Sequence, residues 1–265
     1  MPFPETRRVI YKRNPLDEVI CQLRFPPILK IDKELPADFQ DRVRRSFPNY
    51  AEKGEWKLQF PAELEGQIPS EIMSQALQST ATKNYEFKSE DGSWKINLTR
   101  TFVGLTTSNY HRWEEFTEML ALPMSALLEF YPPEHFTRIG LRYVNIIRRS
   151  RLEMPDRPWS ALIKPHILGI LAAPRIGESV RNFESQYEVG LSDGEGGVRI
   201  RTGLVQASDN EEICYKIDND FFAGKRLEVG QVATNKLNFL NSRSGRLFRW
   251  AITDALHEAM EPVEV

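Results

Sequence analysis

Two pairs of side chains in the sequence have types and spacing that could support chemistry. His111 and Glu115 lie four residues apart in YHRWEE, and on a helix such residues share a face and could act as a general-base pair. Asp218 and Asp220, in KIDND, are expected at a strand end, where paired carboxylates can bind a divalent cation. We favour a simpler interpretation of both pairs, as charged groups at a helix start and at a solvated strand end. An enzyme using either pair is the weaker alternative.

The sequence lacks the common motifs of catalytic and cofactor sites. Its histidines and cysteines are too dispersed for an HxxxH or CxxC metal site, and it has no GxSxG, GxxxxGK[ST] or helix-opening GxGxxG segment. The glycines of DGEGG (193–197) lie between two expected strands, where turn geometry explains them. We therefore expect no catalytic residue, no metal and no cofactor.

The feature that most favours a function is a polar face shared by several expected strands. Alternate residues of a strand face opposite sides of a sheet, so one face should be apolar, with Leu23 and Leu141, and the other polar. The predicted binding residues on that polar face are Gln22, Arg24, Lys95, Asn97, Arg138, Arg142, Arg199 and Arg201. Glutamates 86, 184 and 188 should share it, so its charge is mixed. Such side chains can simply solvate an open sheet, or they can form a recognition surface for a protein or an anion.

The elements that position these residues follow the same order twice. The first half should contain a strand at 19–25, a helix at 36–47, three strands within 84–108 and a helix to residue 130 that Pro123 kinks or divides. The second should contain a strand at 136–149, an interrupted helix at 158–172, strands at 180–191, 198–207 and 212–218, and helices over 228–260 with a break near 244–245.

The sequence thus predicts an α+β protein of two similar β-α-β-β-β-α halves, residues 1–133 and 134–265. Together they should form one largely antiparallel sheet with helices on one face. Residues 49–83 fit this order poorly and are left open as an insertion, an edge strand or a partner-binding arm, with a strand at 56–60 and a helix after Ser70. The outline is similar to the saddle of the TATA-binding protein, a likeness of fold that transfers no function.

Composition narrows the class of protein. Of the 265 residues 41% are hydrophobic and 27% charged, and the net charge is −2, so the chain is a typical globular protein and no polycation. No apolar stretch approaches the roughly 20 residues of a membrane span. Cys21 and Cys214 lie in apolar runs, typical of buried inert thiols. We expect a cytoplasmic protein without membrane contact.

Four segments carry a resemblance to a known family. They are NPLDEVICQLRF (14–25), the block FKSEDGSWKINLTRTFVGLTTSNYHRWEEF (87–116), FTRIGLRYVNIIRR (136–149) and LFRWAITDAL (247–256). The chain resembles a sporadically distributed, functionally uncharacterised family of bacterial proteins of about this length. The resemblance implies a bacterial source and a patchy distribution, typical of mobile, defence or toxin–antitoxin genes. It assigns no catalytic residue.

These observations together favour a non-enzymatic binding or regulatory protein that acts on a protein partner through its open sheet face. The alternative is a nucleic-acid-binding protein that contacts phosphates through Arg24, Lys95, Arg142, Arg199 and Arg201. Few aromatic residues alternate onto the polar face, which disfavours stacking on single-stranded bases. The sequence leaves the oligomeric state open.

Overall fold

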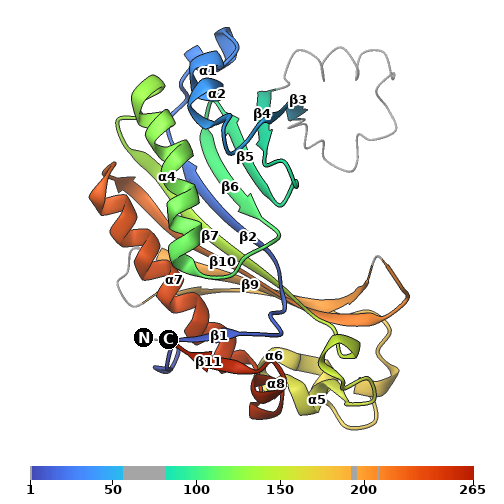
Figure 1. Ribbon diagram of the computed structural model, residues 1–265. Helices are drawn as coiled ribbons and strands as arrows, with labels where there is room; N and C mark the ends of the chain where they lie inside the picture. The colour runs from blue at the N-terminus through green and yellow to red at the C-terminus, as the bar shows by residue number, and fades with distance from the viewer. Residues whose placement is uncertain (1, 56–81, 192–195, 208) are drawn as a thin grey trace, which may run out of the picture.

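The computed structural model describes residues 2–55, 82–191, 196–207 and 209–265. The fold is α+β, and its main feature is a nine-stranded sheet in the order β3-β4-β5-β6-β2-β7-β10-β9-β8 (Figure 1). Every neighbouring pair of strands in it is antiparallel. The strand expected at 56–60, the helix expected after Ser70 and most of the 193–197 turn lie outside the described residues.

The strands of the main sheet are β2 (Leu16–Arg24), β3 (Asn49–Glu55), β4 (Thr82–Lys88), β5 (Trp94–Thr99), β6 (Phe102–Thr107), β7 (Phe136–Ile147), β8 (Glu184–Gly190), β9 (Gly196–Gln206) and β10 (Ile213–Leu227). The order places β2 and β7 side by side at the centre. From there β6, β5 and β4 follow on one side, and β10, β9 and β8 on the other. The segment that begins at residue 49 forms the edge strand β3, one of the three alternatives left open for it. One expectation needs correction, because β10 continues well past Asp218, where the strand was expected to end.

The helices are α1 (Lys30–Lys33), α2 (Ala37–Val43), α4 (Trp113–Phe130), α5 (Trp159–Leu162), α6 (Pro165–Leu168), α7 (Gln231–Ala251) and α8 (Asp254–Ala259), with short 3-10 turns at Ser150–Leu152, Gly169–Ala172 and Gly177–Ser179. A division at Pro123 and a break near Gly245 are both wrong, because α4 and α7 each run through these residues. In both helices a buried apolar stripe packs against the rest of the protein. That burial outweighs one missing hydrogen bond at a proline or about 1 kcal/mol at a glycine.

Helices α4 and α7 lie on one face of the sheet (Figure 1), as expected. The strand residues that alternate toward them, such as Leu23, Leu141 and Ile200, are fully buried. A second group of buried residues joins α5, α6 and α8 to the ends of β7 and β10 through Ile147 and Tyr215. The other face of the sheet carries none of these helices. Within the described chain no helix is long and apolar enough to cross a membrane.

The two ends of the chain meet in a small second sheet that the sequence did not predict. Strands β1 (Val9–Tyr11) and β11 (Pro262–Glu264) pair antiparallel. Ahead of β1, Phe3 is buried and its ring lies 5.3 Å from that of Trp250 in α7. The N-terminal segment from Phe3 to Pro15, which we call the strap, therefore crosses the helix side of the molecule and is fixed at both of its ends.

Candidate functional site

The eight predicted binding residues do share one face of the sheet, the face opposite α4 and α7. They come from four strands, and the strand register places all of them on that side: Gln22 and Arg24 on β2, Lys95 and Asn97 on β5, Arg138 and Arg142 on β7, Arg199 and Arg201 on β9. Five strand spacings separate β5 from β9, which is about 24 Å. The set is therefore a broad surface, which we call the open face.

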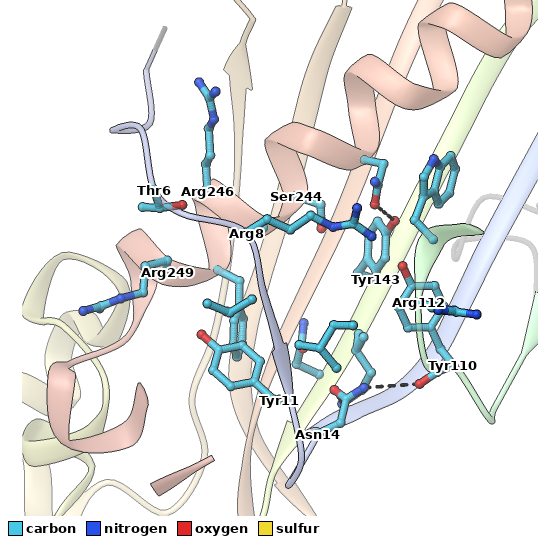
Figure 2. Close-up of a pocket in the computed structure, with 18 of the residues that line it drawn as sticks. Thr6, Arg8, Tyr11, Asn14, Tyr110, Arg112, Tyr143, Ser244, Arg246 and Arg249 are labelled. Carbon is cyan, nitrogen blue, oxygen red and sulfur yellow. Dashed lines mark hydrogen bonds between the residues drawn. The ribbon is translucent and has the colours of Figure 1, made fainter. Parts of the chain in front are cut away.

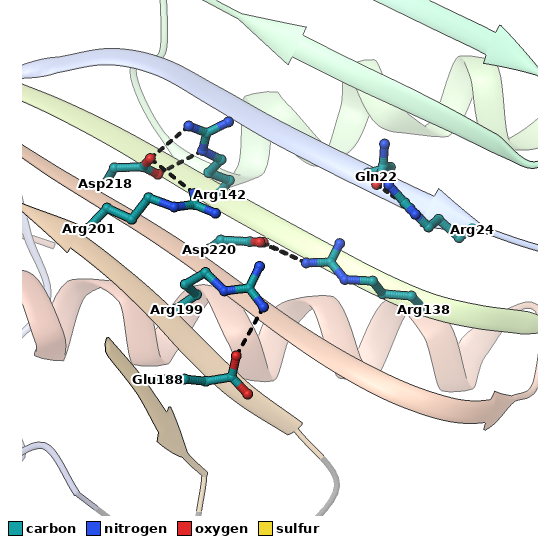
Figure 3. Close-up of polar contacts among 9 residues, drawn as sticks. All are labelled: Gln22, Arg24, Arg138, Arg142, Glu188, Arg199, Arg201, Asp218 and Asp220. Carbon is teal, nitrogen blue, oxygen red and sulfur yellow. Dashed lines mark hydrogen bonds and ion pairs between the residues drawn. The ribbon is translucent and has the colours of Figure 1, made fainter. Parts of the chain in front are cut away.

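Arginines on the β7–β10–β9 part of the open face are paired with aspartates of β10 (Figure 3). Both Arg142 nitrogens that contact Asp218 lie 2.7 Å from its carboxylate oxygens. Arg201 approaches the same carboxylate at 3.4 Å. Since the Asp218 side chain is only 2% exposed, this bidentate pair is a fixed part of the surface.

A second bidentate pair lies beside the first. The Arg138 guanidinium donates to both oxygens of Asp220, at 2.7 and 2.9 Å. It lies flat over Gly140, where an added Cβ would come within 2.1 Å of its Nη1. The ring of Phe222 stands 5.4 Å from the guanidinium carbon. The absence of a side chain at Gly140 thus lets the Arg138 guanidinium lie against the sheet, so this part of the open face is flat.

The remaining arginine of this part is more exposed. Arg199 contacts Glu188 of β8 at 3.1 Å, with side chains 39% and 52% exposed. The sequence analysis predicted a basic surface with some glutamates. Asp218 and Asp220 also lie on this face, which was not predicted: Asp218 was the last residue of the strand expected at 212–218, and Asp220 lay beyond it.

Lysines and arginines on the other part of the open face, formed by β3, β4, β5 and β2, have fewer carboxylate partners than those on β7 and β9. Glu86 is 5% exposed and is approached by Lys53 at 2.9 Å and Lys88 at 3.8 Å. Burial raises the pKa of Glu86, but hydrogen bonding and the charge of Lys53 outweigh it, and the pKa is lowered overall. Arg24 donates to the neutral amide of Gln22. Positive charge is therefore concentrated at this part of the open face.

The cation site considered at Asp218 and Asp220 does not fit the structure. Both residues lie in the middle of β10, where the sequence analysis placed a strand end, and each carboxylate is neutralised by an arginine. No cluster of three or more histidine, cysteine or acidic side chains suited to a metal ion occurs among the described residues. The arrangement holds arginines in place and is unsuited to a divalent cation.

The helix side of the molecule contains a cavity of about 560 Å³ beneath the strap (Figure 2). Its floor includes Tyr143 and Asn145 of β7, and α7 forms one wall with Ser244 and Gly245. The segment before α4 forms another wall, and there Asn14 of the strap donates a hydrogen bond of 3.2 Å to the carbonyl oxygen of Tyr110. Sequence analysis missed this cavity, because only the pairing of β1 with β11 brings the strap over it.

His111 lies at this cavity but not in the pair that the sequence suggested. Helix α4 begins at Trp113 with Arg112 as its N-cap, so His111 precedes the helix and shares no helical face with Glu115. His111 is exposed. It lines the cavity, whereas Glu115 does not. The expected acid–base pair is therefore not assembled.

Hydroxyl groups in and beside the cavity are held neutral. Burial raises the pKa of Tyr110 and of Tyr11 to about 12, and it raises the pKa of Tyr143 well above its usual value. The Tyr143 hydroxyl donates to Asn241 of α7 at 2.8 Å, and the hydroxyl of Tyr11 bonds Nδ1 of His257 at 2.9 Å. Burial and then the charge of Arg249 lower the pKa of His257. These groups supply hydrogen bonds without negative charge.

Comparison with known proteins adds no named relative. No family model and no curated protein matches the chain.

Proposed function

We propose that the protein is a non-enzymatic binding protein whose open face contacts an acidic surface of a protein partner. The observation that carries the proposal is the pairing of Arg138 and Arg142 with Asp220 and Asp218, which makes a broad arginine-rich surface that is locally neutral. Arginine is enriched at protein interfaces, where its stem packs and its guanidinium keeps several donors available.

The partner should carry carboxylates opposite β2 and β5. Arg24 is exposed, and its guanidinium donates a hydrogen bond to the neutral amide of Gln22. Lys95 lies two strands away on the same face. Complementary charge steers association and sets its orientation more than it adds affinity. An acidic patch placed over Arg24 and Lys95 would thus orient the partner on the neutral remainder of the open face.

Contact with nucleic acid is the second candidate, and the ion pairs weigh against it. A phosphate backbone binds through cations that release counterions. Arg142 and Arg138 are committed to carboxylates of the same face, and a phosphate there would meet those carboxylates as well. Arg24 and Lys95 would remain as phosphate contacts.

We further propose that the two halves arose by duplication. The mirrored order of β2-β6-β5-β4 and β7-β10-β9-β8 supports this, together with the helices α4 and α7 that close each half. A bacterial source and a defence or toxin–antitoxin setting stay predictions of the family resemblance.

The partner can be tested with a photo-crosslinking amino acid placed on each side of the sheet. One variant carries it at Lys95 on the open face, and its matched control carries it at Glu118, an exposed position of α4. Each is incubated with extract of the native host. We expect one protein to cross-link at position 95 and to be absent at 118.

Charge reversal tests the chemistry of the contact. Arg24→Glu/Lys95→Glu should abolish retention of the cross-linked protein. The matched control is Arg44→Glu, a charge reversal at an exposed arginine after α2. This variant should still bind the cross-linked protein. Cross-linking from position 118 alone, or equal retention by both variants, would overturn the proposal. Binding of duplex DNA or RNA that weakens steeply with salt and is lost in Arg24→Glu/Lys95→Glu would replace it with the nucleic-acid candidate.

A further inference from the structure

We propose that the cavity beneath the strap is a binding site for a small organic anion with a flat apolar body. This site lies on the helix side of the sheet, so it is separate from the open face and does not depend on the function proposed for that face. Its volume of about 560 Å³ falls within the range of roughly 300–1,000 Å³ that small-molecule pockets occupy.

The Ser244 hydroxyl is a polar group of the cavity wall that is available to a ligand. Ser244 of α7 is 7% exposed and lines the cavity, and its hydroxyl makes no hydrogen bond with any described residue. Asn219 of β10 is fully buried beside Tyr143, and neither atom of its amide has a partner within the described chain. Leaving such a group unpaired costs about 1–3 kcal/mol. A ligand that enters over Tyr143 can satisfy Ser244 directly.

Gly245 gives an independent reason to regard the space as functional. It is the one glycine of the 21-residue helix α7 and lines the cavity. A Cβ added there would meet nothing within 4 Å, so neither packing nor backbone conformation requires glycine. Glycine inside a helix costs about 1 kcal/mol relative to alanine. The cost is understandable if any side chain at this position would occupy room that a ligand needs.

Positive charge at the rim sets the sign of the ligand. Arg112, the N-cap of α4, lines the cavity, and no hydrogen bond or ion pair of its guanidinium is present among the described residues. Glu114 and Glu115 lie in the first turn of α4 and already complement its dipole, so the positive charge available to a ligand comes from arginine side chains. Arg8 reaches over Tyr143 from the strap (Figure 2) and contacts Glu114 of α4 at 2.7 Å. The lining thus offers an anion the uncommitted guanidinium of Arg112.

Aromatic side chains complete the pocket. Tyr11 and Phe248 pack edge to face with ring centroids 5.9 Å apart, and both line the cavity together with Trp113. A flat apolar group buried against these rings loses water contact and gains packing. The expected ligand therefore carries its charge near Arg112 and its ring toward Tyr11.

The test uses the full chain and the fluorescent aromatic sulfonate 8-anilinonaphthalene-1-sulfonate. Its uncharged analogue N-phenyl-1-naphthylamine reports the contribution of the charge. We expect one saturable sulfonate site per folded chain, and binding of the uncharged analogue at least about tenfold weaker. Arg112→Ala should weaken sulfonate binding by about tenfold, as removal of a charged hydrogen bond does, whereas Arg44→Ala should not change it.

Two substitutions at Gly245 show whether the probe occupies the cavity. Gly245→Phe should fill the space and abolish binding, while Gly245→Ala, which adds a single methyl group, should weaken binding only slightly, with circular dichroism confirming that both are folded. The proposal is overturned if the folded protein has no saturable site, or if Gly245→Phe binds the probe as well as Gly245→Ala does. Equal binding of the charged and uncharged probes would overturn the assignment of an anion.

Discussion

Replacement of Arg142 by alanine should destabilise the protein far more than replacement of another arginine on the same face. Arg142→Ala removes two 2.7 Å bonds from Asp218, whose side chain is 2% exposed. A buried carboxylate that loses its partner costs 3–5 kcal/mol in typical cases. Arg142 itself is 39% exposed and Arg201 remains at 3.4 Å. We therefore expect the lower end of the range, about 3 kcal/mol.

The matched comparison is Arg199→Ala. Arg199 and Glu188 are 39% and 52% exposed, and exposed ion pairs contribute about 1 kcal/mol or less. The double variant Arg142→Met/Asp218→Leu removes both charges of the buried pair. It should regain most of the stability lost in Arg142→Ala, because the charge that loses its carboxylate partner, Arg201, is 27% exposed and still donates to Gln186.

Urea unfolding followed by circular dichroism measures these differences from the midpoint and slope of each transition. A loss in Arg142→Ala no larger than in Arg199→Ala would refute the reasoning. So would a double variant as unstable as the single one. Either result would mean that Asp218 is solvated in spite of its low exposed area.

Three further results are expected. Gly245→Ala should raise the free energy of unfolding by about 1 kcal/mol in thermal or urea unfolding, because neither packing nor a positive φ requires glycine there. The hydrogen bond from Arg8 lowers the pKa of Glu114 from 4.5 to about 2, so this pair stabilises the folded state above pH 4.5 and the contribution is lost as the pH falls toward 2. Thermal unfolding measured through that acid range should therefore show that the unfolding temperature falls less for Glu114→Gln than for the unaltered protein. Burial raises the pKa of Cys21 to about 12, and Ellman's reagent should leave this thiol unmodified until the chain unfolds.

Local patterns in the sequence were sufficient to predict the main sheet. Two-residue alternation identified β2, β5, β7 and β9, and it correctly placed the eight predicted binding residues on one face of the sheet. The three strands expected within 84–108 are β4, β5 and β6. These features depend on residues close together in the sequence, so the alternation of apolar and polar residues is enough to predict them.

Features that depend on distant contacts were not predictable. Alternation along β10 continues past Asp218, where the strand was expected to end, so Asp220, the partner of Arg138, was not placed on the open face. Asp218 lay within the expected strand, but its pairing with Arg142 depends on the register between β7 and β10. The breaks expected at Pro123 and Gly245 follow from local propensity, which buried packing of α4 and α7 overrides. No local signal marks the three-residue strands β1 and β11, so the cavity beneath the strap had no sequence signature.

The pairing of β1 with β11 also fixes when the cavity can close during synthesis. Arg7 and Glu264, joined at this small sheet, are 257 residues apart. A ribosome adds about 5–20 residues per second, so the strap exists for roughly 13 to 50 s before its partner strand has been made. The floor from β7 forms from residues made well before that. Helix α7 (Gln231–Ala251), which forms one wall, also comes late in the chain, so the walls and the roof of the cavity are assembled together, long after its floor has been made.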